Sequence, residues 1–519
     1  MTTTTMNSLV GITAREYQDR IARSALNANT LVVLPTGLGK TIIALLVAQG
    51  KLALAPEGRV LMLAPTRPLV MQHSEFFQKH MPEMPVAVVL TGEIPPQERT
   101  ELFNSAKLVF ATPEVIRNDV LEDRYSLSNV SLIVFDEAHR CVRDYAYSQV
   151  AEAYRLTASS PLILGLTASP SSRKSRVEEI CQKLAITNVE TRTEEDTDVV
   201  PYVKQVTVNW VRVPLPPSYK QVSRILRSVL DVRIRKLKVM RQLPLAAPVS
   251  KRILLELGEK LRERLKRGGA GPLYGAVILQ AQSMSLMHSI ELLETHGMRS
   301  LEKALDRLNL ADTKSARSLS KDPQILEVQK LAVSLRDQEH PKLKRLRELV
   351  ASDLVVNKAA KVIVFTQFRD SVETIVDTLD SVEGASPVRF VGQATRSEAD
   401  VGLSQSEQMD ILERFRGGEY NVLVTTSIGE EGLHVPDVDH VIFYEAVPSE
   451  IRLIQRRGRT GRTRPGKMTV LLAEGTIDEA YYWTSRRREE QMHRFMETVS
   501  RKGVRPRAGK RKMTLDDYS

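Results

Sequence analysis

The segment Leu34–Thr41 contains the residue types that hold a triphosphate. It reads Leu-Pro-Thr-Gly-Leu-Gly-Lys-Thr and lies between a short apolar run and a helical pattern, the context of a phosphate-binding loop. Gly37 and Gly39 let backbone N–H groups face the phosphates without a Cβ in the way. Lys40 can reach the β- and γ-phosphates, and Thr41 can ligate Mg²⁺. The segment therefore predicts a site for a magnesium nucleotide.

Two acidic residues follow the apolar run Leu132–Phe135. They are Asp136 and Glu137, in the sequence Asp-Glu-Ala-His. Parallel α/β sheets place their chemistry at the carboxyl ends of strands, which is where these acids fall. We expect Asp136 to hold Mg²⁺ through water. We expect Glu137 to orient and deprotonate the attacking water.

A second basic motif lies far downstream, at residues 455–462. It reads Gln-Arg-Arg-Gly-Arg-Thr-Gly-Arg. Arg459 and Arg462 are three apart, so on a helix they share a face. Guanidinium groups suit the charge that develops on a γ-phosphate in the transition state. A chain with both segments can bind one nucleotide between two domains and convert its hydrolysis into relative motion.

Short apolar runs alternate with helical patterns in two stretches of the chain. Each run is too short for a helix and apolar on both faces, which is typical of buried parallel strands. The first stretch contains Leu31–Leu34, Val60–Ala64, Val86–Leu90, Leu108–Ala111, Leu132–Phe135 and Leu162–Leu166. The second contains Val362–Phe365, Val388–Val391, Val422–Val424, Val441–Tyr444 and Thr469–Leu472. We predict an α/β fold with two parallel-sheet lobes.

The segment between these stretches differs in pattern and charge. After a strand expected at Val206–Val213, apolar residues keep helical spacing until the second stretch begins. Residues 204–274 contain 17 Lys and Arg against 4 Asp and Glu. A charge run is often only a solvated face, but this excess of like charges repels itself unless a polyanion lies near. We predict an all-helical insert that contacts phosphate backbones.

Composition limits the class of protein. The chain has 519 residues and a formal net charge of +11, which suits a polyanionic partner. Its two cysteines, Cys141 and Cys181, are too few for a disulfide framework, and we expect both in the core. No apolar run approaches ~18 residues, and residues 1–8 lack a secretion signal. We therefore expect a cytoplasmic protein with no membrane contact.

Ten segments together resemble a known family. The chain is similar to superfamily 2 DEAH/DExD-box helicases over nearly its whole length. Three features make it most similar to the helicase part of archaeal Hef and to the Fanconi anaemia M and Mph-type enzymes: Phe-Thr-Gln-Phe-Arg, Ser-Ile-Gly-Glu-Glu-Gly and the basic insert. The segments are Arg15–Gln18, Leu34–Thr41, Ala64–Arg67, Ala111–Pro113, Asp136–His139, Gly165–Pro170, Phe365–Arg369, Gly402–Gln405, Ser427–Gly432 and Gln455–Arg462.

The resemblance implies two RecA-like lobes with an all-helical domain between them, and ATP with Mg²⁺ as cofactors. Residues 1–205 would form the N-terminal ATP-binding lobe, and residues 206–338 the helical, basic DNA-binding insert. Residues 339–482 would form the C-terminal lobe. Residues 483–519, which are also basic, would form a C-terminal helix and tail.

The resemblance also assigns roles to single residues. Gln18, with Arg15 nearby, would read adenine, and Gln455 would act with Arg459 and Arg462 where the lobes meet. The other residues expected at the nucleotide are Pro35, Thr36, Gly37, Leu38, Gly39, Lys40, Thr41 and Gly432. The residues expected at the nucleic-acid backbone are Arg67, Thr91, Gly92, Thr112, Gln367, Gln393 and Thr425. The residues expected to couple hydrolysis to movement are His139, Thr167 and Ser169.

The sequence departs from the family pattern in two places. His434 stands where the family commonly has Asp, and a histidine is not a fixed anion, which puts its contact to the nucleotide or to a motif arginine in doubt. Hef often carries an XPF-type nuclease, but this sequence shows no Glu-Arg-Lys nuclease signature, so we expect no nuclease activity. Residues 512–519 resemble a degenerate sliding-clamp (PCNA) binding peptide, with a disordered tail as the alternative.

These features predict an ATP-dependent DNA helicase or translocase. By resemblance it would move 3′ to 5′ on branched DNA, such as stalled forks and Holliday junctions, in repair and replication restart. Its location would be the archaeal nucleoid. One alternative is a double-stranded RNA helicase or sensor of the RIG-I/Dicer type, which would read A-form shape. Another is a DNA-binding scaffold without catalysis, which the set of Lys40, Asp136, Glu137, Arg459 and Arg462 argues against. The sequence leaves the oligomeric state open.

Overall fold

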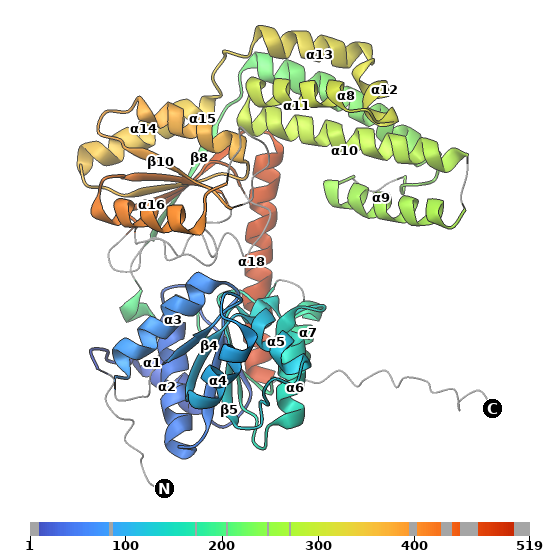
Figure 1. Ribbon diagram of the computed structural model, residues 1–519. Helices are drawn as coiled ribbons and strands as arrows, with labels where there is room; N and C mark the ends of the chain where they lie inside the picture. The colour runs from blue at the N-terminus through green and yellow to red at the C-terminus, as the bar shows by residue number, and fades with distance from the viewer. Residues whose placement is uncertain are drawn as a thin grey trace, which may run out of the picture.

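The computed structural model describes most of the chain. The described residues are 10–82, 87–171, 174–203, 206–245, 249–268, 271–393, 402–426, 438–446 and 466–502. They form an N-terminal lobe, a second lobe and an all-helical segment, and one long helix runs between the two lobes (Figure 1).

The N-terminal lobe contains a seven-stranded sheet in the order β3-β4-β2-β5-β6-β1-β7, and all of its strands are parallel. All strands except the terminal strand β7 are mainly apolar on both faces, which is why the short runs of the sequence formed a buried parallel sheet. They are β1 (Thr30–Val33), β2 (Arg59–Leu63), β3 (Val88–Leu90), β4 (Leu108–Ala111), β5 (Val130–Phe135), β6 (Ile163–Thr167) and β7 (Asn188–Thr191).

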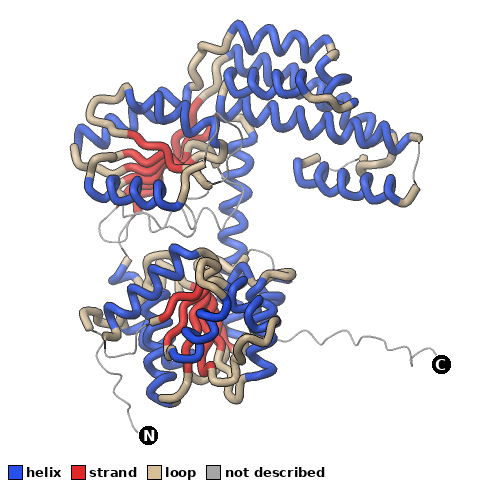
Figure 2. Tube along the Cα trace, viewed as in Figure 1, coloured by secondary structure: helices blue, strands red, loops and turns tan. Residues whose placement is uncertain are grey.

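Helices cover both faces of this sheet (Figure 2). One core lies under α1 (Glu16–Ala25), α2 (Lys40–Leu54) and α3 (Arg67–His80). The other lies under α4 (Pro96–Ser105), α5 (Pro113–Leu121), α6 (Ala146–Thr157) and α7 (Lys174–Lys183). Two short 3₁₀ turns, η1 (Ala138–Arg140) and η2 (Val200–Tyr202), complete the lobe. Cys141 and Cys181 are buried and unpaired, as expected.

The second lobe contains a six-stranded parallel sheet in the order β10-β11-β9-β12-β13-β8. Helices α14 (Pro341–Val356) and α15 (Arg369–Asp380) pack on one face, and α16 (Gln405–Gly417) packs on the other. The strands are β8 (Val206–Val213), β9 (Val362–Phe365), β10 (Pro387–Phe390), β11 (Val422–Thr425), β12 (His440–Phe443) and β13 (Gly466–Ala473).

One strand lies in a different unit from the one predicted. The strand at residues 206–213 was expected, but it was assigned to the helical insert of residues 206–338. In the structure it is β8, which pairs in parallel with β13 along its full length at the end of the second sheet. The physical reason is that a strand needs a partner for its backbone groups, and the helices that follow it offer none.

In the described part of the segment between β8 and the rest of the second lobe, the structure has six helices. Their apolar faces make two connected cores, one shared by α8, α10, α11, α12 and α13 and a smaller one between α8, α9 and α10. The helices are α8 (Pro217–Val239), α9 (Lys251–Lys266), α10 (Pro272–His296), α11 (Met298–Leu310), α12 (Lys314–Ser320) and α13 (Pro323–Ser334).

The last described element is α18 (Ile477–Lys502). Figure 1 shows it leaving the second lobe and ending beside the N-terminal lobe. Across the described ranges, none of the helices combines the length and the apolar character needed to span a membrane.

Candidate functional site

The predicted functional residues of the N-terminal lobe lie along one edge of its sheet. Because all seven strands are parallel, their carboxyl ends meet at the same edge. The strand order separates two groups of residues along it. The residues expected at the nucleic acid follow β2, β3 and β4 in one half of the sheet. Asp136 follows the central strand β5, and the nucleotide loop follows β1 in the other half.

The phosphate-binding loop has the backbone that its glycines predicted. Gly37 and Gly39 have φ values of +85° and +78°, in the left-handed region that favours glycine. A Cβ at Gly39 would lie 2.3 Å from Nε2 of Gln18, so the packing also excludes a side chain there. Helix α2 begins at Lys40, whose ammonium donates to two loop carbonyls at 3.0 and 3.3 Å. A helix N-terminus and a lysine converge on the loop, which suits a phosphate anion.

Gln18 stabilises the conformation of this loop through a hydrogen bond to its backbone. Its side chain is fully buried, and its Nε2 donates to the carbonyl of Leu38 at 3.0 Å. Its Oε1 accepts from the N–H of Arg15 at 2.9 Å, and the hydroxyl of Tyr17 donates to the same Leu38 carbonyl at 2.7 Å. The guanidinium of Arg15 lies over the ring of Tyr202 at 4.8 Å. Gln18 and Arg15 thus lie beside the nucleotide loop, while adenine recognition by them stays a prediction.

Asp136 is held in place by two residues that the sequence did not single out. Its Oδ2 lies 2.8 Å from Nε2 of His73, and its carbonyl accepts from the hydroxyl of Tyr147 at 2.6 Å. Burial opposes a charge on Asp136. The hydrogen bond with His73 and the positive charge of Lys40 nevertheless hold the pKa of Asp136 below its ordinary value. An ionised carboxylate near the phosphate-binding lysine is the chemistry that Mg²⁺ binding requires.

Among the residues that the structure describes, one carboxylate oxygen of Glu137 has no hydrogen-bond partner. Its Oε2 is buried, and it accepts no hydrogen bond within the described residues although Nδ1 of His139 lies 3.1 Å away. The backbone of Glu137 has a φ of 49°, a left-handed value that is uncommon for a side chain of this kind. A strained acid with an unsatisfied oxygen beside Asp136 fits a base that orients water. The chain's own residues therefore fit a magnesium nucleotide.

The three residues predicted to couple hydrolysis to movement lie together. Nδ1 of His139 lies 3.2 Å from Oγ1 of Thr167, and the same Oγ1 accepts from the N–H of Ser169 at 3.2 Å. Thr167 ends β6, which is the strand next to β5 in the sheet. A contact path therefore leads from the carboxylate of Glu137 to Ser169.

Of the four residues expected at the nucleic acid in the N-terminal lobe, three reach the surface. Arg67 begins α3 and forms an ion pair with Glu93. Gly92 is exposed, and Thr112 is partly exposed at the start of α5. Thr91 is buried, with 6% of its surface exposed. Since Arg67 already pairs with an acid, a phosphate contact from it would have to displace Glu93.

The second lobe repeats this arrangement. Gln367 follows β9, Gln393 follows β10 and Thr425 ends β11, three neighbouring strands of the sheet. Gln393 is exposed, and Gln367 is half-buried with its Nε2 donating to the carbonyl of Ala446 at 2.9 Å. Thr425 is fully buried, and its hydroxyl donates to the carbonyl of Thr426 at 3.1 Å. The structure therefore brings Gln367 and Gln393 to this edge but does not expose the side chain of Thr425.

A buried acid supports the backbone of Gln367. Oε1 of Glu445 accepts from the N–H of Gln367 and from the hydroxyl of Thr366, the latter at 2.9 Å. Burial raises the pKa of Glu445 to about 7, against smaller opposing effects of these hydrogen bonds and of Lys342. Nε2 of His296, at the end of α10, lies 3.7 Å from the same oxygen. This acid thus lies where the helical segment meets the second lobe.

Four predicted site residues lie outside the described residues. They are Gly432, Gln455, Arg459 and Arg462, and His434 lies outside them as well. Their roles stay predictions.

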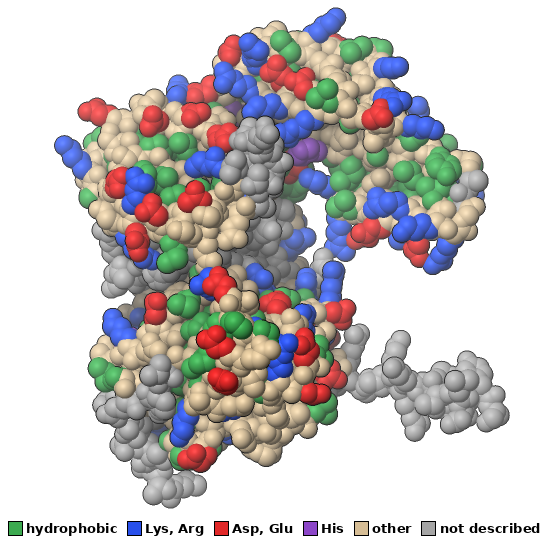
Figure 3. Space-filling model, viewed as in Figure 1, with side chains coloured by type: hydrophobic (Ala, Val, Ile, Leu, Met, Phe, Trp, Pro, Cys, Tyr) green, Lys and Arg blue, Asp and Glu red, His purple; other side chains and the backbone are tan. Residues whose placement is uncertain are grey.

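The helical segment carries the basic charge that the sequence placed there. Figure 3 shows Lys and Arg side chains distributed over its surface. Some pair with acids, such as Arg227 with Glu294 at 2.7 Å and Lys251 with Glu291 at 2.8 Å. The exposed basic residues of α8 and α9 include Lys220, Arg224, Arg235, Lys236, Lys260, Arg262 and Lys266.

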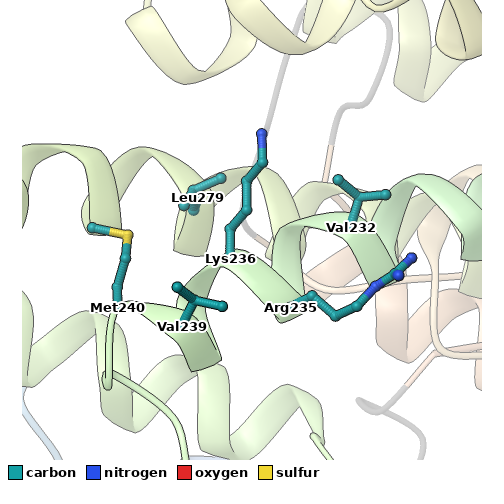
Figure 4. Close-up of a pocket in the computed structure, with 6 residues that line it drawn as sticks. All are labelled: Val232, Arg235, Lys236, Val239, Met240 and Leu279. Atoms are coloured by element: carbon teal, nitrogen blue, oxygen red, sulfur yellow. The ribbon is translucent and has the colours of Figure 1, made fainter.

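A hollow of about 430 Å³ opens between α8 and α10. Its lining is mostly apolar, from Val232, Val239, Met240 and Leu279. Figure 4 shows the charged ends of Arg235 and Lys236 extending away from it in different directions. The aliphatic stems of these two residues line the hollow while their charges stay at the surface, where a phosphate backbone could meet them.

Residue motifs do not reveal every residue of the site. His73, Tyr147 and Tyr202 belong to no segment that the resemblance matched, and each touches the site through a fold contact. His73 lies on α3, six residues after Arg67, a spacing that carries no signal of its own.

Three family models match the chain. The model described as DEAD/DEAH box helicase matches residues 15–177, and the helicase conserved C-terminal domain matches residues 341–464. The model "Putative ATP-dependent RNA helicase, helical bundle" matches residues 218–339. The helical match begins after β8, and the C-terminal match includes residues 432–462.

Individual proteins are similar over most of this chain. A "Putative ATP-dependent RNA helicase" from Methanocaldococcus jannaschii is 41% identical over 490 residues, which is 94% of this chain and 61% of that protein. The DEAD-box ATP-dependent DNA helicase Fancm of Drosophila melanogaster is 35% identical, over 89% of this chain and 33% of that protein. The chain thus spans only part of the length of the curated relatives it matches.

One solved structure is similar to this chain over nearly the whole length of both. The crystal structure of the Pyrococcus furiosus Hef helicase domain has a TM-score of 0.70 and 43% identity, and the match covers 91% of this chain and 98% of that one. Both lobes and the helical segment are therefore shared with that domain. The chain belongs to the Hef-type family of DEAD/DEAH-box helicases.

Proposed function

We propose that this chain is an ATP-driven DNA helicase or translocase that acts on branched DNA. Stalled forks and Holliday junctions are the substrates we infer, and DNA repair and replication restart the setting. The direction of movement in the proposal is 3′ to 5′. ATP and Mg²⁺ would bind at the loop of Lys40 and Thr41, next to Asp136 and Glu137.

One observation carries this proposal. In both sheets, the residues expected at the nucleic acid follow three adjacent strands, β3, β4 and β2 in the first sheet and β10, β11 and β9 in the second. In the first sheet, the nucleotide loop follows a strand in the other half. A strand of nucleic acid and a nucleotide can therefore lie side by side along these edges. Movement of one lobe against the other would then shift the bound strand.

In this proposal the motor cycle uses the chain's own groups in order. Lys40 and the start of α2 would bind the phosphates, and Asp136 would hold Mg²⁺, which would supply positive charge at the triphosphate. Glu137 orients a water molecule and takes its proton. Arg459 and Arg462 would meet the γ-phosphate from the second lobe, so that hydrolysis weakens the contact between the lobes.

The helical segment supplies a grip on the duplex arm of a branch. Its exposed basic residues on α8 and α9 suit phosphate contacts, which set affinity without reading sequence. The carboxyl edges of the two sheets hold one strand, while the basic surface of α8 and α9 holds a duplex. A fork offers both a single strand and a duplex. This division of labour is the reason for proposing a branched substrate.

A double-stranded RNA substrate is the second candidate. Its support is that two of the matched descriptions, the helical-bundle model and the M. jannaschii relative, name an RNA helicase. The name of the D. melanogaster relative specifies DNA, and the matched structure is of a Hef helicase domain. An RNA duplex would be read through its shape and 2′-hydroxyls.

A contact with a sliding clamp through residues 512–519 is a further part of the proposal. These residues lie outside the described ranges, so the support is the sequence pattern alone. Deletion of residues 512–519 should abolish clamp binding in a pull-down with the purified clamp. Unchanged clamp binding by the shortened chain would remove this part of the proposal.

Strand separation tests the proposal. Wild-type protein should unwind a labelled DNA fork only with ATP and Mg²⁺, and Lys40→Ala should bind the fork with unchanged affinity but fail to unwind it. Lys51→Ala, at the other end of α2, is the matched control and should behave as wild type. Fork unwinding by Lys40→Ala at the wild-type rate would contradict the assignment of the nucleotide site.

A further inference from the structure

The first turns of helix α18 are fixed to the second lobe by buried polar and aromatic contacts. Asp478, in its first turn, is buried and forms an ion pair with the buried Lys342. Its carboxylate also accepts from the N–H groups of Ala446 at 2.8 Å and Ala473 at 3.1 Å. One turn later Tyr482 packs edge-on against Trp210 of β8, with ring centroids 4.0 Å apart. The start of α18 must therefore move with the second lobe.

The other half of α18 belongs to the N-terminal lobe. Met492 has 1% of its surface exposed and lies in the core of that lobe, and Phe495 packs against the same core. Asp478 and Met492 are separated by about 21 Å along the helix at 1.5 Å per residue. Figure 1 shows the helix crossing from one lobe to the other. A single continuous helix thus has one end in each lobe.

Met492 contacts a residue of the coupling group directly. The hydroxyl of Ser169 donates to Sδ of Met492 at 2.9 Å, across 323 positions of sequence. Ser169 is itself buried, with 1% of its surface exposed. Its N–H donates to Oγ1 of Thr167, which lies 3.2 Å from His139, and His139 lies 3.1 Å from the carboxylate of Glu137. The contacts form one unbroken path from α18 to the residue that orients water.

We propose that Met492 is a positioning residue through which the second lobe acts on the Ser169 loop. A displacement of the second lobe moves α18, and Met492 then shifts against Ser169 and disturbs the path to Glu137. The inference rests on the proposed function, because it assigns to the same ATP-driven enzyme a contact through which its two lobes communicate. It adds a second connection between the lobes, separate from the nucleotide between them.

The chemistry of the contact between Ser169 and Met492 suits an interaction that is broken and re-formed when the lobes move. A thioether is a weak acceptor, so exchanging its hydrogen bond costs less than breaking one to a carboxylate. Burial of Met492 and Phe495 in the N-terminal core keeps the helix attached while that bond is exchanged. An unbranched methionine also adapts its shape to a shifting neighbour.

Core packing alone is the competing explanation for Met492. It predicts that loss of the side chain lowers stability and changes nothing else. Ile180 of α7 provides the matched control, because it is a fully buried aliphatic residue of the same core. A packing role predicts the same behaviour for Met492→Ala and Ile180→Ala.

The spacing of the lobes is the first test and needs no nucleic acid. Spin labels on cysteines replacing Leu121 and Val356, which are 70% and 79% exposed, report the distance between the lobes. The native Cys141 and Cys181 are buried, with pKa values raised by burial to about 11 and about 12, so they resist labelling. The labelled chain without further substitutions should give one narrow distance distribution. Met492→Ala and Phe495→Ala should each at least double its width, and Ile180→Ala should not. Equal widths in all four proteins would overturn the proposal.

The second test is the number of base pairs unwound per ATP hydrolysed. Met492→Ala should keep DNA-stimulated ATP hydrolysis within about threefold of wild type but lower this ratio at least tenfold. Met492→Leu restores the packing volume and should recover at least half of the ratio. An unchanged ratio in Met492→Ala would overturn the proposal while leaving the motor intact. A wild-type protein without DNA-stimulated hydrolysis would refute the proposed function instead, and the lobe spacing would still decide whether α18 ties the lobes together.

Discussion

Nε2 of His73 lies 2.8 Å from Oδ2 of Asp136, so a helix on one face of the N-terminal sheet holds the acid at its carboxyl edge. Both groups are buried, and His73 comes from α3, which also begins with Arg67. The same helix therefore contacts the acid that we expect to hold Mg²⁺ and carries a residue expected at the nucleic acid. If both expectations hold, this contact gives nucleic-acid binding a short physical route to the acid expected to hold Mg²⁺.

Removing this support should slow hydrolysis without unfolding the protein. His73→Ala leaves Asp136 free to rotate, and loss of such a supporting hydrogen bond lowers metal affinity or activity by about 10–100-fold in comparable sites. We expect the ATPase of His73→Ala to need more Mg²⁺ and to fall at least tenfold at limiting Mg²⁺. His80→Ala, at the half-buried last residue of the same helix, is the control. A wild-type Mg²⁺ dependence in His73→Ala would show that the hydrogen bond has no role in metal binding.

Gly39 should tolerate no side chain. Gly39→Ala places a Cβ 2.3 Å from Gln18 and forces a left-handed backbone on alanine, so the loop must distort. We expect Gly39→Ala to weaken binding of a fluorescent ATP analogue at least tenfold. Gly275→Ala is the matched control: it lies within α10, where a Cβ meets nothing closer than 3.8 Å. Gly275→Ala should bind the analogue normally and have equal or higher stability.

Glu445 should make stability depend on pH. Its pKa rises from an ordinary 4.5 to about 7 through burial, so the folded state binds a proton more tightly than the unfolded state. That contribution to stability is fully present below about pH 4.5 and is lost as pH rises through about 7. Glu445→Gln mimics the protonated form. We would measure the free energy of unfolding of wild type and variant at pH 5 and pH 8. At pH 8 the variant should be more stable than wild type by on the order of 3 kcal/mol, and this difference should shrink at pH 5.

The two histidines near Glu445 change stability with pH in the opposite direction from Glu445. Burial and the charge of Lys342 hold the pKa of His296 well below its ordinary value, and His340 has a pKa of about 3. A depressed pKa in the folded state makes stability fall as pH drops through the ordinary histidine value. Wild type and Glu445→Gln both keep these two histidines, so their effect cancels in the difference between the two proteins. The remaining neighbours, Lys342 and Asp478, form a buried ion pair. A gap of equal size at both pH values would show that Glu445 does not titrate in this range.

The basic surface of the helical segment should set the salt dependence of DNA binding. Arg235→Ala with Lys236→Ala removes two exposed charges from α8. Each lost phosphate contact lowers the slope of log affinity against log salt by about 0.9. We expect a fork-binding slope lower by roughly 2 with the double variant, measured by fluorescence anisotropy. Lys51→Ala with Lys358→Ala removes the same charge away from this surface and should leave the slope unchanged. A similar loss of slope in both pairs would indicate a nonspecific effect of net charge.

The sequence pattern predicted much of the fold because buried parallel strands have a distinct signature. β4, β8 and β9 have the predicted boundaries, and the other predicted runs differ from β1, β2, β3, β5, β6, β10, β11, β12 and β13 only at their ends. β7 was missed because its residues, Asn-Val-Glu-Thr, include a single apolar position and it lies at the end of the sheet. The sheet membership of β8 was wrong because a run of residues does not record which distant strand completes its hydrogen bonds.

The residues of the candidate site also fall into two groups. Some were predictable from local sequence, and others are recognised only through tertiary contacts. Glycine conformation, the lysine at the start of α2 and the acids after β5 follow from local sequence, and the structure has them where they were expected. His73 on Asp136 and Met492 on Ser169 join residues that are 63 and 323 positions apart. Contacts of that kind depend on how helices pack on sheets, so no local spacing could predict them.

The ATPase rate measured against four nucleic acids at fixed salt tests the central claim most directly. Forked DNA, linear duplex DNA, single-stranded DNA and double-stranded RNA would each be added to wild-type protein and to Lys40→Ala. The account predicts strong stimulation of the wild type by forked DNA, much weaker stimulation by RNA, and no hydrolysis by Lys40→Ala. Stimulation by double-stranded RNA alone would contradict a branched-DNA motor and identify the basic helices as a clamp for A-form duplex.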